Sequence, residues 1–442
     1  MTRLAPVVSL LLTCSLAHGF ALRKSDDGKV LCLGTQSVTV RIDTSTVSQL
    51  GGAADAVQAG FVAWTSAGMP ATVKFKAQKN LKLAADGKNS VLWQTGEWLY
   101  SEHVVAMTVT SYKRSTGRVT ESDIVLNARD HKWAVDPAPG SNAYDVQNVV
   151  AHEAGHFFGL GHSAQTDATM YRTTPAEETQ KRVLTADDRA GIAALIAVIN
   201  ATGGDSESVV DDGKADTPEQ LDGDMPDRGD EQVGCSVGGS FSSAGSWLWP
   251  SLVLGLGLLL RCRRVAPAVA FVAALLPSAP VEASVVRQLS LAQLHAESAA
   301  VVRGAVTARR SFVDPKTNLI VTDHTIRVSR CFKRGAAACQ ASVTLQTLGG
   351  EVGDRGVHVE GMPRLAVGQQ VILFGRRAGA RLMPVGLSLG VFKLDLKTRK
   401  AVRDLRGLDL LRGGRRVEGG LERVDIRTLE AELERLAPKP TR

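Results

Sequence analysis

The last third of this 442-residue sequence contains no tryptophan and no tyrosine. All six Trp and all four Tyr lie before residue 251, and aromatic residues make up only 5% of the chain. The mean hydropathy of −0.01 excludes a membrane protein with many spans. Hydrophobic residues make up 44% and charged residues 22%, which excludes wholesale disorder. The uneven aromatic content and the length together predict two or three modules of different composition.

Basic residues outnumber acidic ones in the same part of the chain that has no tryptophan and no tyrosine. The whole sequence has a net charge of +7, but residues 1–200 carry 19 basic and 18 acidic side chains. Residues 201–234 carry 2 basic and 11 acidic side chains, residues 235–284 carry 3 and 1, and residues 285–442 carry 28 and 15. Because the basic excess lies behind an acidic spacer, we expect separate modules and no nucleic-acid partner.

Cysteine is also scarce, with six residues in the chain. The N-terminus has an arginine, an apolar run and small residues before a cleavage position after Gly19, so residues 1–19 are predicted to be a secretory signal peptide. Export brings the chain into oxidising conditions, where Cys331 and Cys339 are close enough in sequence for a small disulfide loop. Two unpaired thiols are the alternative.

The first 200 residues alternate between strand-like and helix-like segments. Alternating apolar and polar residues predict strands at 36–43, 72–77, 90–94, 104–112 and 123–127. Helical spacing of apolar residues predicts helices at 53–67, 148–160 and 184–199. Residues 20–200 are therefore expected to form an α/β domain with a twisted sheet of about five strands and three helices.

Residues 285–442 are predicted to form a separate, mostly-β accessory domain, either a small barrel or a sandwich. Gly-rich turns separate short β-like runs at 300–307, 319–328, 342–347, 370–374 and 391–396. A terminal helix is expected at 429–436. This region shows no metal-binding or nucleophilic motif, so its function is not predicted.

The clearest chemical signal is the run His-Glu-Ala-Gly-His-Phe-Phe-Gly-Leu-Gly-His at residues 152–162. On a helix, His152 and His156 project from one face and can bind one metal ion. Gly159 can end the helix and turn the chain, so that His162 supplies a third nitrogen. Three neutral imidazoles leave one open position for water on a tetrahedral Zn²⁺, which acidifies that water. Glu153 is then the candidate general base and acid for peptide-bond hydrolysis.

This run matches every fixed position of HExxHxxGxxH, and residues 36–199 resemble the metzincin family of zinc endopeptidases. Ser163, directly after the third histidine, is typical of the matrixin branch, and Leu184–Ile192 is similar to the matrixin C-terminal helix. Ala168–Tyr171 resembles the methionine turn. The resemblance implies a metzincin catalytic fold, with Met170 as a hydrophobic floor and Tyr171 as a wall of the primed-side pocket.

The resemblance also implies where a substrate binds. An edge strand at Val105, Ala106, Met107 and Thr108 would take the substrate as one more strand. Asp187 or Asp188 would tether the last helix to the site.

The chain departs from the matrixin pattern in what it lacks. No Pro-Arg-Cys-Gly latency segment is present, and Cys32 is interpreted as a buried thiol or as a cap on the zinc. Only His103 and His131 remain in the domain for the family's second, structural zinc, so that site is not expected. Ca²⁺ binding is possible but is assigned to no residues, because no loop pattern stands out.

The middle of the chain is predicted to hold the protein at the cell surface. Residues 201–234 are an acidic, Gly-rich stretch typical of a disordered linker. Cys235, the uncharged run at 241–260 and the arginines at 261–264 resemble a MYXO-CTERM sorting tail, which implies processing near the cysteine. Residues 265–284 are a second apolar segment, either the return span of a membrane hairpin over residues 241–283 or the signal peptide of a fused second protein.

The sequence as a whole thus predicts a zinc-dependent endopeptidase that is exported and is either anchored at the cell surface or secreted after processing. Its partner would be a protein or peptide substrate. The alternative is a surface protein that binds polyanions or a partner through the basic C-terminal domain, with a metal domain that does no catalysis.

Overall fold

The computed structural model describes residues 19–33, 37–45, 50–98, 100, 102, 104–201, 289–333, 340–404, 409–412, 415–418 and 421–437. By their contacts, these residues belong to a single compact unit. Within them, no helix is both long and apolar enough to cross a membrane. The predicted signal peptide up to residue 18, the linker and sorting tail with Cys235, the second apolar segment and Cys339 all lie outside the described residues.

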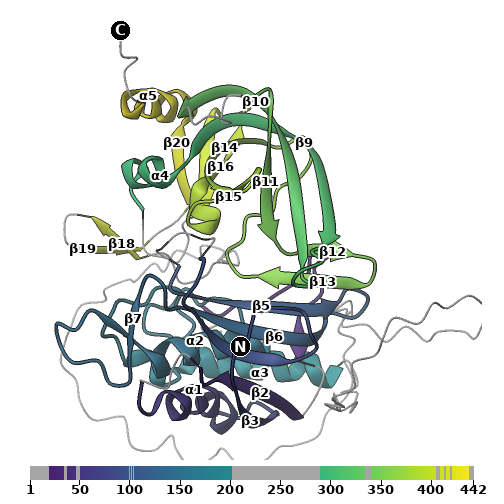
Figure 1. Ribbon diagram of the computed structural model, residues 1–442, viewed down its shortest axis with the longest axis vertical. Helices are drawn as coiled ribbons and strands as arrows, with labels where there is room; N and C mark the ends of the chain where they lie inside the picture. Colours follow the sequence, from purple (N-terminus) through teal and green to yellow (C-terminus); the bar gives the residue numbers. More distant parts are fainter. Residues whose placement is uncertain are drawn as a thin grey trace, which may run out of the picture. The chain divides into compact units, whose positions relative to one another are not determined.

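The N-terminal region contains the five strands and three helices expected from its sequence (Figure 1). The strands are β1 (Cys32–Leu33), β2 (Ser37–Asp43), β3 (Thr72–Gln78), β4 (Asn89–Gln94), β5 (Ala106–Lys113), β6 (Arg118–Asn127), β7 (Lys132–Ala134) and β8 (Ala143–Asp145), of which β1, β7 and β8 are short additions. The helices are α1 (Ala53–Ser66), α2 (Val146–Phe158) and α3 (Ala186–Ala201), with a 3-10 turn η2 (Gln180–Arg182).

The main strands of this region form one mixed sheet in the order β5-β6-β4-β2-β3. Strands β3, β2, β4 and β6 run parallel to one another, whereas β5 runs antiparallel to β6. In a parallel sheet, the helices that connect successive strands lie on the faces of the sheet and cover them. Helices α1 and α2 cover one face, and β5 lies at the edge where α2 passes.

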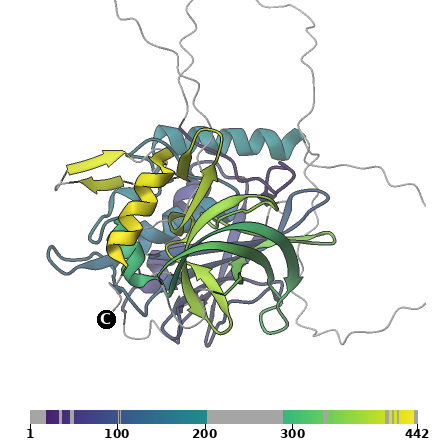
Figure 2. The same ribbon diagram turned by 90° about the horizontal axis from the view of Figure 1, so that it is seen from above.

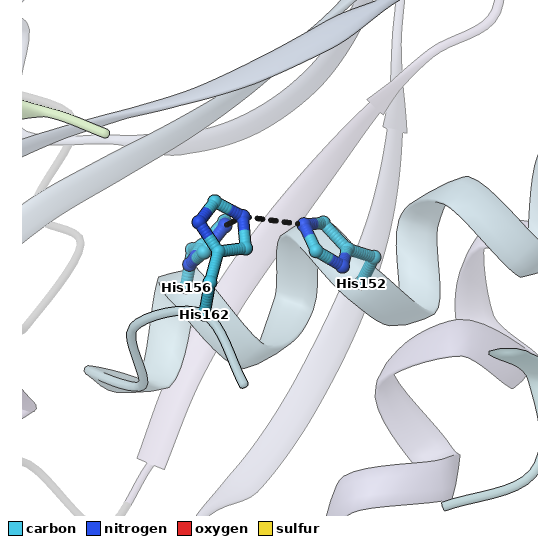
Figure 3. Close-up of side chains that lie close together, drawn as sticks. All are labelled: His152, His156 and His162. Carbon is cyan, nitrogen blue, oxygen red and sulfur yellow. Dashed lines mark hydrogen bonds between the residues drawn. The ribbon is translucent and has the colours of Figure 1, made fainter. Parts of the chain in front are cut away.

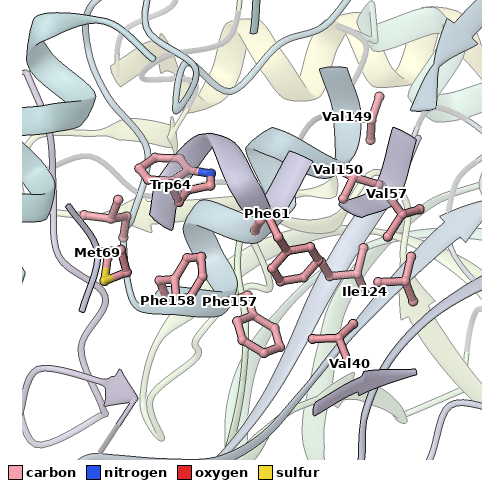
Figure 4. Packing of buried hydrophobic residues seen from close by; sticks show 14 of the residues in the cluster. Val40, Val57, Phe61, Trp64, Met69, Ile124, Val149, Val150, Phe157 and Phe158 are labelled. Atoms are coloured by element: carbon pink, nitrogen blue, oxygen red, sulfur yellow. The ribbon is translucent and has the colours of Figure 1, made fainter. Parts of the chain in front are cut away.

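Aliphatic and aromatic side chains together fill the core between the sheet and the helices (Figure 4). Phe61 of α1 packs edge-on against Phe157 of α2, with ring centroids 5.1 Å apart, and against Phe75 of β3 at 5.8 Å. Trp64 of α1 donates its indole N–H to the carbonyl of Ala151 on α2 at 2.7 Å. These contacts fix α2, the helix that carries the histidine motif, against the rest of the domain.

The C-terminal region is mostly β, as predicted. Its elements are α4 (Leu291–Glu297), β9 (Ala300–Val313), β10 (Ile320–Lys333), β11 (Ser342–Leu348), β12 (Gly350–Val352), β13 (Arg355–Val359), β14 (Gln370–Ala378), β15 (Arg381–Pro384), η3 (Leu387–Gly390), β16 (Val391–Asp395), β17 (Lys400–Asp404), β18 (Asp409–Arg412), β19 (Arg415–Glu418), β20 (Leu421–Asp425) and α5 (Ile426–Leu436). Strands β9, β10, β11, β15 and β14 close into a ring, because β15 pairs with both β11 and β14. The long strands β9 and β10 curve strongly in Figure 2, as barrel strands do.

One hairpin departs from the expectation of two separate domains. Strand β13 pairs antiparallel with β12 on one side and with β5 of the N-terminal sheet on the other. The N-terminal sheet is therefore continued by two strands that come from the C-terminal region. Sequence patterns could not show this pairing, because its partners lie about 250 residues apart.

Candidate metal centre

Helix α2 places the first two histidines on one face. Its first turn is capped by Asp145, whose carboxylate accepts a hydrogen bond from the backbone N–H of Asn148 at 2.7 Å. Its last residue is followed by Gly159, which has φ 117° and ends the helix in the left-handed conformation. A Cβ at this glycine would lie 2.3 Å from the carbonyl oxygen of Leu31, so no other residue fits.

The turn at Gly159 brings the third histidine back over the helix (Figure 3). The Nε2 atom of His162 lies 3.0 Å from Nε2 of His152 and 3.0 Å from Nε2 of His156. All three ligand nitrogens lie within 4.8 Å of one another, close enough to contact one ion. Among the residues that the structure describes, this is the one cluster of three or more possible metal ligands.

The surroundings of the three rings suit a metal cation. Nδ1 of His152 lies 2.7 Å from the carbonyl oxygen of Thr169, and Nδ1 of His156 lies 2.8 Å from that of Leu160. A carbonyl can only accept, so each Nδ1 carries the proton and each Nε2 keeps its lone pair for a metal. Burial lowers the pKa of His156 to about 4 and holds the pKa values of His152 and His162 well below the usual range. Three neutral imidazoles are the donor set that zinc takes in catalytic sites, so the residues fit this metal.

Glu153 lies next to His152 on α2 and is almost completely buried, with 1% of its surface exposed. Its Oε2 accepts a hydrogen bond from the Thr108 hydroxyl on β5 at 2.6 Å. Its Oε1 is buried without a hydrogen-bond partner among the described residues. Burial raises the pKa of Glu153 to about 7, against the lowering effect of the Thr108 hydroxyl. A carboxylate with this pKa can exchange a proton near neutral pH.

Met170 lies under the histidine helix. A Cβ added at Gly155, which lies between His152 and His156 on α2, would be 2.1 Å from the Met170 sulfur. The methionine therefore packs directly on the helix backbone where a larger residue than glycine would clash. Tyr171 follows it and is also buried, with its ring close to the Lys181 ammonium group at 5.9 Å. The wall of a substrate pocket at Tyr171 stays a prediction.

Helix α3 is tied to this turn by two aspartates. Asp188 accepts hydrogen bonds from the backbone N–H groups of Thr169 at 2.8 Å and Met170 at 2.9 Å. Asp187 accepts from the hydroxyl of Ser163 at 2.5 Å and from the backbone N–H of Gly19 at 2.7 Å. Each aspartate thus contacts a segment next to a zinc-ligand candidate.

The four residues of the expected substrate strand are all buried. They are Val105, Ala106, Met107 and Thr108, and the Thr108 hydroxyl donates a hydrogen bond to Glu153. The pairing of β5 with β13 covers Val109–Lys113 and ends one residue from Thr108. The expected substrate edge at Val105–Thr108 stays a prediction, and the strand residues that follow it, Val109–Lys113, are covered by β13.

Arg23 is a residue of this site that sequence reasoning missed. Its guanidinium donates to the carbonyl of His156 and to the hydroxyl of Thr110, both at 2.8 Å. It also lies 3.4 Å from the carboxylate of Glu360, which follows β13. No local pattern marks Arg23, because its partners come from three distant parts of the chain.

The remaining predicted residues lie away from the three histidines. The Cys32 thiol is buried in the apolar core of β1 and is not among the clustered ligand atoms. Cys331 is disulfide-bonded, and because Cys339 lies outside the described residues its pairing stays a prediction.

Comparison with known proteins agrees with this geometry. A family model described as Matrixin matches residues 35–197. "Metalloendoproteinase 1" of Glycine max is 41% identical over 73 residues, which make up 16% of this chain and 24% of that protein. "Metalloendoproteinase 1-MMP" of Arabidopsis thaliana is 46% identical over 66 residues, which make up 14% of this chain and 18% of that protein. The chain spans a quarter or less of the length of these curated relatives. Residues 35–197 thus match a matrixin domain, which has the α/β metzincin fold.

Proposed function

We propose that this chain is a zinc-dependent endopeptidase in which Glu153 is the general base. The observation that carries the proposal is the convergence of three neutral, buried imidazoles beside a buried carboxylate inside a matrixin domain. His152, His156 and His162 would hold the zinc, and Met170 would support the helix that carries them. The second zinc and Ca²⁺ are not part of the proposal.

A zinc ion held by these nitrogens supplies Lewis-acid chemistry, which acidifies water and polarises a carbonyl oxygen. The chain's own contribution is the handling of the proton. Glu153 takes a proton from the attacking water on its carboxylate and then delivers it to the leaving amine. The hydroxyl of Thr108 orients this carboxylate through the hydrogen bond to Oε2, so the buried Oε1 is the oxygen left for the proton.

The substrate is proposed to be an extended polypeptide. Thr108 joins β5 to Glu153, so a peptide that paired with the edge of β5 would pass the general base. Val105, Ala106, Met107 and Thr108 are the strand residues proposed for that contact, and Tyr171 is proposed to shape the primed side.

The protein is further proposed to act outside the cytoplasm. This part rests on the sequence of residues 1–19 and on the Cys235, apolar and arginine pattern up to residue 264. Polyanion binding by the C-terminal region is less supported, because several of its arginines pair with acidic side chains of the same region. These arginines are Arg303, Arg330, Arg381 and Arg403.

The proposal is tested with the full chain by measuring bound zinc and the hydrolysis of labelled casein, with and without a chelator. We expect one zinc per chain and a loss of hydrolysis on chelation. Glu153→Ala should keep the zinc and lose activity by about 10²- to 10⁴-fold, the range of general-base catalysis. Glu97→Ala, which removes an exposed carboxylate from the same domain, is the matched control. Equal activity of Glu153→Ala and the parent protein would disprove the mechanism.

A further inference from the structure

Strand β13 occupies the edge of β5 directly beside Thr108, the last of the four residues that a substrate is proposed to contact. Its five residues pair with β5 in the antiparallel register Arg355 with Lys113 through Val359 with Val109. An extended peptide binds a protein by adding a strand to an exposed sheet edge, and one edge accepts one strand. In this structure the strand at the β5 edge belongs to the chain itself.

The segment after β13 continues toward the catalytic residues. Glu360 directly follows the last paired residue, and its carboxylate lies 3.4 Å from the Arg23 guanidinium. That guanidinium also donates to the carbonyls of His156, at 2.8 Å, and His358, at 3.4 Å. One buried cation therefore links the segment around β13 to the helix that carries the zinc ligands.

The contact also has an apolar core that both regions supply. Met107 and Val109 of β5 belong to the same buried cluster as Val357 and Val359 of β13, with Leu319 of the segment before β10. The three histidines and Glu153 are each at most 1% exposed. The catalytic groups are thus closed off from solvent in the presence of this contact.

We propose that the C-terminal region, residues 289–437, is a built-in inhibitor of the matrixin domain that acts by filling the β5 edge with β13. This inference rests on the proposed function, because it concerns access to the same site. It gives the chain a source of latency although it lacks the Pro-Arg-Cys-Gly segment. Activation then requires that β13 leaves β5.

Gly356 offers a way to separate the strands without touching the catalytic groups. It pairs with Tyr112, and a Cβ at this glycine would lie 2.2 to 2.6 Å from three atoms of the tyrosine ring. Gly356→Val should therefore push β13 away from β5. The double variant Gly356→Val with Tyr112→Ala restores the space. Gly51→Val is the matched control, since a Cβ there meets no other atom within 4 Å.

Each variant is tested as the full, zinc-loaded chain. Binding of fluorescein-labelled casein peptides is measured in a Glu153→Ala background, where nothing is cleaved, and hydrogen exchange of residues 106–113 reports the pairing. Gly356→Val should speed exchange and tighten peptide binding about tenfold or more, because overpacking shifts an equilibrium by one or two factors of ten. With Glu153 intact, hydrolysis should rise by a similar factor. Gly51→Val should bind like the parent. The double variant should bind more weakly than Gly356→Val, although it also loses the hydrogen bond from the Tyr112 hydroxyl to Glu351.

Two outcomes would overturn the inference. One is peptide binding that stays unchanged although exchange of β5 becomes faster, and the other is a parent protein that already binds as tightly as Gly356→Val. If Gly356→Val does not fold, Glu351→Ala replaces it, because Glu351 of β12 holds the Tyr112 hydroxyl at 2.9 Å and Arg114 at 2.7 Å. Glu351→Ala should likewise speed exchange of β5 and tighten peptide binding, by a few-fold. Tighter binding without hydrolysis in any variant would disprove the proposed function and leave the inhibitor standing.

Discussion

The two outer strands of the N-terminal sheet, β3 and β5, meet their surroundings in opposite ways. Strand β3 pairs only with β2 among the described strands, and its exposed positions include Lys74 and Lys76. Strand β5 is buried over most of its length, and β13 pairs with its outer side. Met107 and Val109, on the face of β5 opposite Thr108, belong to an apolar cluster shared with the C-terminal region.

This difference indicates which edge of the sheet is suited to pairing with another strand. Proteins protect a free edge by placing charged side chains, lysine above all, where another strand would have to pair. Strand β3 has this protection. Strand β5 has almost none, with its one lysine at its last position, Lys113. The uncharged edge of β5 next to Glu153 is suited to pairing with a peptide. In the absence of a peptide, β13 of the same chain pairs with it.

The largest difference in stability between the two sides of the sheet is expected from Arg23→Met, which removes a buried cation on the β5 side. This change leaves the Glu360 carboxylate buried without the guanidinium that lies 3.4 Å away and removes two hydrogen bonds to the β5 and α2 segments. Breaking a buried ion pair from one side costs about 3 kcal/mol or more, so the free energy of unfolding in urea should fall by that amount.

Lys76→Met on β3 is the control for the loss of a cation at the other edge. Because Lys76 is exposed, the free energy of unfolding should change by less than about 0.5 kcal/mol. Equal losses of unfolding free energy in Arg23→Met and Lys76→Met would show that the buried cation contributes no more to stability than an exposed lysine on β3.

The parts of the site that sequence reasoning predicted are those that local chemistry determines. The three histidines lie within eleven consecutive residues, so helix geometry and one glycine turn suffice to bring them together. The strands and helices of the N-terminal region follow from periodicity for the same reason, and most bounds differ from the prediction by only one or two residues. The exception is β6, which starts five residues before the predicted strand at 123–127.

The parts that were missed depend on contacts between distant residues. Alternation predicts the strand at β5, but it does not show that residues 355–359 pair with its outer edge. Arg23 lies in a short segment without periodicity and becomes a central residue only because it meets α2, β5 and Glu360 in space. Such pairings have no local signature in one sequence.

A second, smaller effect is a pH dependence on the β5 side of the sheet. Glu121 of β6 lies opposite Ser111 of β5, and burial raises its pKa from 4.5 to about 7 against two backbone hydrogen bonds, from Asp86 and Gly87. Between these pH values the folded chain keeps a proton that the unfolded chain has released. The free energy of unfolding should therefore fall as pH rises from 4.5 to 7, by roughly 2 kcal/mol from this group.

Glu121→Gln tests this contribution, because the amide stays uncharged throughout. Urea titrations at pH 4.5, 6 and 7 should show a shallower decline in the unfolding free energy than in the parent protein. Glu97→Gln, at an exposed position, should reproduce the parent's profile. A decline that is equally steep in Glu121→Gln would place its source elsewhere.

The smallest effect on stability, and the sharpest test of edge protection, is expected from Lys74→Thr combined with Lys76→Thr. Both side chains are exposed, so the unfolding free energy should change by no more than about 0.5 kcal/mol. Threonine favours strands and carries no charge, so β3 becomes an edge on which a second copy can pair, and sedimentation velocity should detect self-association. Lys79→Thr with Lys82→Thr removes the same charge just outside β3 and should stay unassociated. If both double variants associate equally, net charge and not the edge position keeps the chains apart. If only the β3 variant associates, the two edges of this sheet differ in that one repels a strand and the other is built to hold one.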